Sequence, residues 1–114
     1  MGKRSAPILS VMLDEIESID QALKSVTFDE FCNQWQLRRA VQRGIEIISE
    51  ASRRLNDDVK AERPDINWRQ VGGIGNILRH EYHKISDKVI WDVVRHDFPP
   101  LKAALSDLWE KYGE

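Results

Sequence analysis

The sequence predicts an all-α protein, an up-and-down bundle of about five helices. Apolar residues recur at steps of three and four over most of the 114 residues, which is the spacing of helices with one buried face. Ser, Thr or Asn stands where several of these stripes begin, as expected for helix N-caps. Alternation of apolar and polar residues never persists for the length of a strand. One domain, residues 1–114, is expected.

The first helix is expected to begin near Ser5, because Pro7 is tolerated in a first turn. Thr27 and Glu30 have the spacing of a capping box, which predicts a short helix from Phe28 to about Asn33. The expected buried stripe of the first helix is Ile8, Met12, Ile16, Ile19, Leu23 and Val26.

A long helix is predicted from about Trp35 to Leu55. Ala40 and Gly44, one turn apart, would let another helix approach closely, within the fold or across a dimer. Its arginines are expected to be mostly solvated partners of nearby carboxylates. The inward stripe is Leu37, Val41, Ile45, Ile48, Ala51 and Leu55, and the arginines are Arg38, Arg39, Arg43, Arg53 and Arg54.

The next segment contains Pro64 and other helix breakers, so a loop with about one helical turn is expected. Asn67, with Gln70 three residues later, predicts the start of a further helix. Glycines weaken this helix, which indicates backbone packed closely against another element or a partner subunit. These glycines are Gly72, Gly73 and Gly75, and the apolar stripe is Trp68, Val71, Ile74, Leu78 and Tyr82.

Two helices are predicted in the last part of the chain. Ser86 is the expected N-cap of a helix from Asp87 to about Arg95. Asp97 and the two prolines that follow Phe98 predict the start of the last helix. The stripe of that helix is Leu101, Leu105, Leu108 and Tyr112.

Composition excludes several classes of protein. Cys32 is the only cysteine, so an internal disulfide and a cysteine-rich metal site are excluded, and a reducing, cytoplasmic location is expected. The sequence contains no run that approaches the roughly 20 apolar residues of a membrane span. The net charge is −2, yet residues 35–84 hold 10 Lys and Arg against 7 Asp and Glu. This middle segment could therefore present a face that binds phosphate groups.

The same segment carries a cluster of polar residues. Asn76 and His80 are one turn apart on one helix face, as are Gly75 and Arg79. Arg79 is expected to lean back over surface that Gly75 leaves bare. A titratable imidazole beside a fixed cation suits phosphodiester chemistry, because the histidine can move a proton and the arginine can stabilise the developing negative charge. Spacing alone favours the alternative, in which Arg79 and Glu81 are solvated and His80 is a helix-surface histidine whose hydrogen bonds are satisfied.

Metal and nucleotide chemistry have little support in the sequence. His80 and His83 are three residues apart and lack the pattern of a zinc protease. No glycine-rich loop ends in Lys-Ser or Lys-Thr, which argues against an NTPase. No metal and no cofactor are expected.

From Leu9 to about Leu108 the chain resembles the HepT-like branch of the HEPN domains, small all-α proteins of bacterial and archaeal toxin–antitoxin pairs. The resemblance implies a single HEPN-type helical bundle. The matching segments are the opening amphipathic helix, residues 28–31, 40–51, 64–71, 74–83, 89–94 and 97–101.

The signature of the family is an arginine, four residues, a histidine, one residue and a tyrosine. His80 and Tyr82 match it, and Asn76 matches the polar residue that usually follows the arginine. Gly75 stands at the arginine position, and Arg79, one turn later, is the candidate substitute.

The resemblance implies a toxin that cleaves RNA without metal at the cleft of a homodimer. His80 would be the acid or base, Arg79 the cation, and Asn76 a residue that orients the phosphate or the imidazole. Tyr82 would accept AMP from a minimal nucleotidyltransferase antitoxin, and this modification would silence the site. Gly75 keeps a second function open, that of a catalytically inactive helical binding partner of a nucleotidyltransferase. A helical bundle without any ligand is the third alternative.

Overall fold

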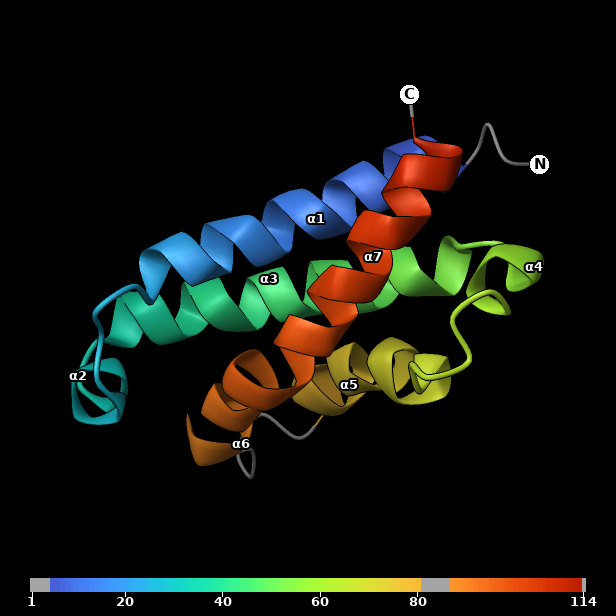
Figure 1. The fold of residues 1–114 in the computed structure, drawn as a ribbon. Coiled ribbons are helices and arrows are strands. Elements are labelled where there is room, and N and C mark those ends of the chain that lie inside the picture. The colour runs from blue at the N-terminus through green and yellow to red at the C-terminus, as the bar shows by residue number, and fades with distance from the viewer. Residues whose placement is uncertain (1–4, 81–86, 114) are drawn as a thin grey trace.

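The computed structural model describes residues 5–80 and 87–113, without the side chains of residues 79 and 80. Within these ranges all regular secondary structure is helical, which confirms the expected all-α, HEPN-type helical bundle (Figure 1). The elements are α1 (Ser5–Ala22), α2 (Phe28–Cys32), α3 (Trp35–Arg54), α4 (Asp57–Lys60), α5 (Trp68–His80), α6 (Asp87–Asp92), the π-helix η2 (Val93–Asp97) and α7 (Phe98–Tyr112).

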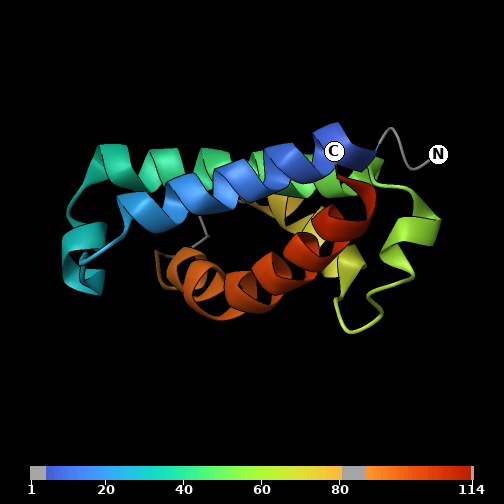
Figure 2. The same cartoon turned by 45° about the horizontal axis from the view of Figure 1, so that its top comes forward.

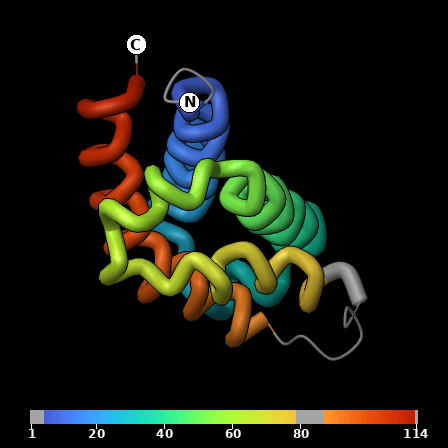
Figure 3. Tube along the Cα trace, turned by 90° about the vertical axis from the view of Figure 1, so that its right-hand side faces the viewer, coloured from blue at the N-terminus to red at the C-terminus, as the bar shows by residue number. Residues whose placement is uncertain are grey.

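The long helices are arranged around α3. α1 and α5 both run antiparallel to α3, and α7 crosses obliquely and packs on α1 (Figures 1 and 2). Seen along the bundle, these helices surround one interior (Figure 3). Its core contains residues from all four of them, including Leu9, Met12, Ile16, Ile45, Ile48, Leu78, Leu101, Leu105 and Leu108, each at most 3% exposed. None of the helices in the described ranges combines the length and apolarity needed to span a bilayer.

The connection between α1 and α2 differs in one detail from the sequence prediction. α1 ends at Ala22, so the stripe does not continue in a helix to Val26. Ser25 instead takes a left-handed conformation, with φ of 64°, which ends the helix in a turn. The predicted capping box is confirmed: the Glu30 amide donates to Thr27 Oγ1 (3.1 Å), and the Thr27 amide donates to Glu30 Oε1 (2.9 Å).

Arg95 fastens η2 to the turn that follows α1. One guanidinium nitrogen donates to the backbone carbonyls of Leu23 (3.2 Å) and Val26 (3.3 Å). The guanidinium also lies over the ring of Trp91, 4.4 Å from its centroid, and that ring packs against Phe31. The two hydrogen bonds of Arg95, its cation–π contact with Trp91 and the packing of Trp91 on Phe31 therefore hold this end of the bundle together.

α6, η2 and α7 follow one another without a break, whereas the sequence predicted an interruption near residue 96. Pro99 and Pro100 have no amide hydrogen, so they cannot donate to the carbonyls four residues before them. The chain widens into a π-turn there instead of ending, and the Phe98 amide donates to the Val93 carbonyl, five residues back. The two prolines occupy the first turn of α7, as predicted.

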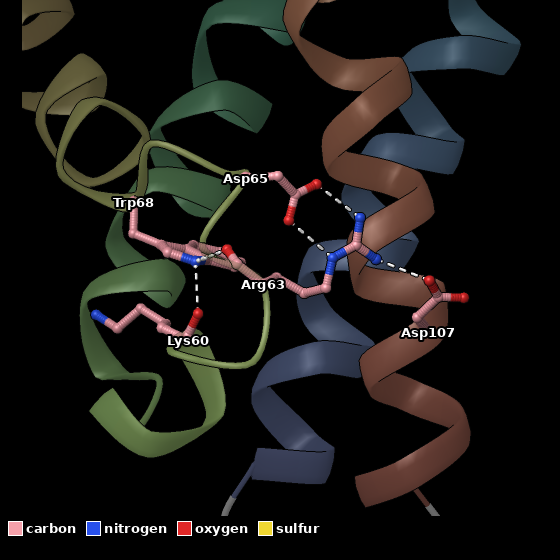
Figure 4. A network of polar contacts seen from close by, with 5 residues as sticks. All are labelled: Lys60, Arg63, Asp65, Trp68 and Asp107. Atoms are coloured by element: carbon pink, nitrogen blue, oxygen red, sulfur yellow. Dashed lines mark hydrogen bonds and ion pairs between the residues drawn. The ribbon is translucent and has the colours of Figure 1, made fainter.

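The loop between α4 and α5 is tied to both neighbouring helices (Figure 4). The Arg63 guanidinium forms two hydrogen bonds with Asp65 (3.0 and 2.7 Å) and a third with Asp107 of α7 (2.7 Å). The Trp68 indole, at the start of α5, donates to the carbonyls of Lys60 (3.0 Å) and Arg63 (3.1 Å). The start of α5 is therefore fixed relative to α4 and α7 by polar contacts that sequence spacing does not reveal.

This network predicts a pH-dependent contribution to stability. Hydrogen bonding to Arg63 lowers the pKa of Asp65 below its ordinary range. The contribution of Asp65 to the free energy of unfolding is therefore fully present above the ordinary aspartate pKa of about 3.9. It is lost as the pH falls through the lowered pKa of the folded protein. Asp65→Asn should destabilise the protein at pH 7, and its difference from wild type in free energy of unfolding should shrink near pH 2.5.

Urea unfolding at the two pH values measures this difference. Asp14→Asn removes an exposed charge that forms no ion pair within the described ranges, so it reports the effect of net charge alone. An Asp65→Asn difference of equal size at both pH values would contradict the assignment.

Candidate functional site

The site expected from the sequence lies on α5, whose start agrees with the prediction. The Gln70 amide donates to Asn67 Oδ1 (3.0 Å), so Asn67 caps the helix. α5 then continues through Arg79 to His80. The side chains of Arg79 and His80, and the whole of Tyr82 and Ser86, lie outside the described residues.

α5 packs on α3 through its glycines. The buried Ser49 hydroxyl donates to the Gly72 carbonyl (2.9 Å) and accepts from the Gly75 amide (3.0 Å). Arg53 Nη1 donates to the same Gly72 carbonyl (3.1 Å). The close backbone approach therefore occurs within the chain, between α3 and the α5 glycines Gly72 and Gly75, whereas for Gly73 the expectation is wrong, because a Cβ there would meet nothing within 4 Å. Gly44 also packs closely within the chain, since a Cβ there would lie 2.7 Å from Ile19 Cδ1 of α1.

Gly75 has no room for a side chain. A Cβ at this position would lie 2.8 Å from both the Cβ and the Oγ of Ser49, and 3.4 Å from the Glu46 Cα. The expectation that Gly75 leaves surface bare for Arg79 is therefore wrong, because α3 covers that surface. The signature arginine position of this chain faces a helix and could hold an arginine only if α5 moved away from α3.

The opposite face of α5 is open. Asn76 is exposed, Ile77 is 47% exposed, and a Cβ added at Gly73 would meet nothing within 4 Å. Arg69 continues this exposed face toward the start of the helix. Of the predicted site residues, Asn76 is thus the one whose side chain the structure describes, and that side chain is exposed.

A cavity of ≈ 250 Å³ lies behind α5, between α3, η2 and α7. Its wall is mostly apolar, with Ile45 and Ile48 of α3 facing Val71 and Ile74 of α5. Its polar lining residues are Asp65, Asn67, Gln70 and Asp97, and apolar residues of η2 and α7 complete the wall. Helical periodicity predicted Val71 and Ile74 as inward residues, but the incomplete filling between the helices has no signal in the sequence.

Two other kinds of site receive no support. Partial burial, followed by the Asp87 carboxylate, raises the pKa of the Cys32 thiol, which disfavours the reactive thiolate. Within the described ranges no three His, Cys, Asp or Glu residues are grouped in a way that could hold a metal ion.

The contrast between Gly75 and Gly73 predicts opposite effects of the same substitution. Gly75→Ala should lower the free energy of unfolding by about 1–3 kcal/mol, because the new methyl group overlaps Ser49. Gly73→Ala, on the open face of the same helix, should raise it by about 0.5–1 kcal/mol through the better helix propensity of alanine. Urea unfolding followed by circular dichroism measures both, and stabilisation by both substitutions would contradict the packing described here.

Comparisons with known proteins give the same assignment as the fold. The chain is 35% identical to a candidate RNase of Methanocaldococcus jannaschii over 90% of this chain and 94% of that protein. It is 32% identical to the "Probable ribonuclease HepT" of Thermococcus cleftensis, covering 95% and 98% of the two chains. A candidate RNase of Caldanaerobacter subterraneus subsp. tengcongensis is 28% identical, with 96% and 97% covered. No solved structure matches significantly.

The family model described as "Ribonuclease HepT-like" matches residues 12–108, which extend from α1 to the last turns of α7. This match covers the loop network, the glycine contact between α5 and α3, and the open face around Asn76. The chain belongs to the ribonuclease HepT-like family.

Proposed function

We propose that this protein is a metal-independent endoribonuclease that acts at the cleft of a homodimer and serves as the toxin of a toxin–antitoxin pair. Membership of the ribonuclease HepT-like family supports the activity. The observation that carries the proposal is the open face of α5, where Asn76 is exposed on a helix that continues through Arg79 to His80.

The proposed reaction needs no metal. The ribose 2′-hydroxyl attacks the neighbouring phosphorus and loses its proton to a base, while an acid protonates the departing 5′-oxygen. His80 supplies an imidazole, the side chain that most often acts as a general acid or base near neutral pH. Arg79 stabilises the charge on the pentavalent phosphate, and Asn76 orients the phosphate or the imidazole.

A homodimer completes this chemistry. One α5 supplies a single histidine, whereas the reaction uses one base and one acid. A two-fold axis that sets two copies of α5 against a common cleft supplies both. The excess of Lys and Arg in residues 35–84 is compatible with RNA phosphates near that cleft.

His80→Ala should reduce RNA cleavage in EDTA by about 100-fold or more, because acid–base catalysis contributes roughly that much. Arg79→Ala should reduce it by about 100-fold through loss of charge stabilisation. Gel analysis of labelled RNA measures both rates, with circular dichroism to verify the fold. Arg54→Ala, which removes the same charge from an exposed side chain in the last turn of α3, is the matched control and should retain activity.

Wild-type activity in the His80→Ala protein would refute the catalytic assignment. Wild-type activity in Arg79→Ala would reject Arg79 as the substitute cation while leaving His80 in place.

The geometry at Gly75 favours a second candidate function. The usual motif arginine is replaced by Gly75, and Ser49 occupies the space that a side chain at this position would need unless α5 moved away from α3. The protein would then be a catalytically inactive helical partner of a minimal nucleotidyltransferase. Tyr82 is the proposed AMP acceptor under either function, since the added phosphate would introduce negative charge where RNA phosphates bind.

AMP transfer should separate these roles. Incubation with ATP and the cognate nucleotidyltransferase should raise the intact mass of the wild-type protein by one or more AMP units, and Tyr82→Phe should abolish the increase. If the unmodified protein cleaves RNA and the modified protein does not, the toxin assignment holds. AMP transfer to a protein that never cleaves RNA would favour the inactive partner, and transfer to Tyr82→Phe would refute the acceptor.

A further inference from the structure

An exposed tryptophan and an arginine form a stacked pair at the start of α3. Trp35 is 58% exposed, more than any other large apolar side chain in the described ranges. The guanidinium carbon of Arg39, one turn later, lies 5.5 Å from the indole centroid. Within the same ranges Arg39 forms no ion pair with a carboxylate. An open aromatic face beside a cation, here called the Trp35–Arg39 pair, requires an explanation because burying such a ring would stabilise the protein.

The chain contains a second pair of the same chemistry that has a structural role. Arg95 stacks on Trp91, but there the guanidinium donates to the carbonyls of Leu23 and Val26, and the indole packs against Phe31. Both members are therefore occupied by the fold. The Trp35–Arg39 pair has no such contacts in the described part of the chain, so its exposed indole face is available to a ligand.

The Trp35–Arg39 pair lies on the face of α3 that α5 covers farther along. The helical repeat places it in line with Glu46 and Arg53, which contact Gly75 and Gly72 of α5. Because α5 is antiparallel to α3, contacts move toward the start of α3 as α5 proceeds toward His80. Figure 1 shows α3 continuing toward α2 beyond the end of α5. Among the described residues, the Trp35–Arg39 pair thus lies on the part of this face beyond the end of α5.

We propose that the Trp35–Arg39 pair binds single-stranded RNA, with an unpaired base stacked on the indole and a neighbouring phosphate held by Arg39. This inference rests on the proposed ribonuclease function and extends it to the substrate class. Base–aromatic stacking tolerates any base and requires a strand that is not paired. The exposed indole and the Arg39 guanidinium, which forms no ion pair with the described carboxylates, supply the two contacts that such a strand uses, one to its base and one to its phosphate.

The test separates binding from chemistry. For a single-stranded RNA oligonucleotide, Trp35→Ala should raise KM about tenfold, since stacking corresponds to roughly 5- to 150-fold in affinity, and kcat should be unchanged. Trp35→Phe, which retains an aromatic face, should keep most of the affinity. Arg39→Ala should raise KM. It should also make the plot of log affinity against log salt concentration less steep by the amount expected for about one phosphate contact. A dinucleotide, which spans the cleaved phosphate alone, should be cut equally by wild type and Trp35→Ala.

Arg54→Ala is the matched control, because it removes an exposed arginine, paired with Glu50, from the far end of α3. It should leave KM unchanged. Equal KM values for wild type and Trp35→Ala in a protein that cleaves RNA would overturn this inference alone. Absence of RNA cleavage and RNA binding in the wild type would overturn the ribonuclease proposal as well. If light scattering showed that the Trp35→Ala protein is a monomer whereas the wild type is a dimer, Trp35 would belong to a subunit contact. That result would also overturn the inferred binding of RNA by the Trp35–Arg39 pair.

Discussion

The hydroxyl of Ser49 lies between two backbone groups of α5, donating to the Gly72 carbonyl and accepting from the Gly75 amide. Both partners are glycines, so α5 approaches α3 until a Cβ at position 75 would overlap Ser49. A buried hydroxyl with both hydrogen-bonding capacities satisfied favours one rotation and one register of α5. The rotation of α5 about its own axis, and so which of its described residues face α3, depends on this contact.

Because of this contact, one face of α5 is directed into the bundle and the other is exposed. Val71 and Ile74 line the interior, and Leu78 is buried in the core. Asn76 and Ile77 are exposed on the other side. The Arg63 network fixes the start of the helix, and Ser49 fixes its middle, so the residues that follow are carried by a well-supported element. Catalytic groups need such support, because small displacements reduce rates strongly.

Much of the fold could be predicted because it depends on local patterns. The stripes of α3 and α7 and the Thr27–Glu30 capping box involve residues within a few turns of each other. The ion pair between Arg63 and Asp107 joins residues 44 positions apart, and no local rule reveals it. The π-turn before Pro99 was missed because a proline pair normally indicates a new helix start.

The site was predictable to a similar extent. Asn76 lies off the apolar stripe of α5 and is exposed, as residues off such a stripe usually are, and its role in the site stays a prediction. The environment of Gly75 was not predictable, since it depends on which helix lies opposite, and a serine inside α3 has no distinctive signal in a sequence. The exposed indole of Trp35 was missed for the same reason: periodicity assigns it to no buried stripe and does not show what covers the helix start.

The chemical ends of cleaved RNA test the proposed mechanism most directly. Attack by the 2′-hydroxyl, with proton transfer by histidine and no metal, leaves a 2′,3′-cyclic phosphate on one fragment and a 5′-hydroxyl on the other. Mass spectrometry of RNA treated with the purified protein in EDTA should find these ends. Fragments with 5′-phosphates and 3′-hydroxyls, or cleavage that requires added magnesium, would contradict the account.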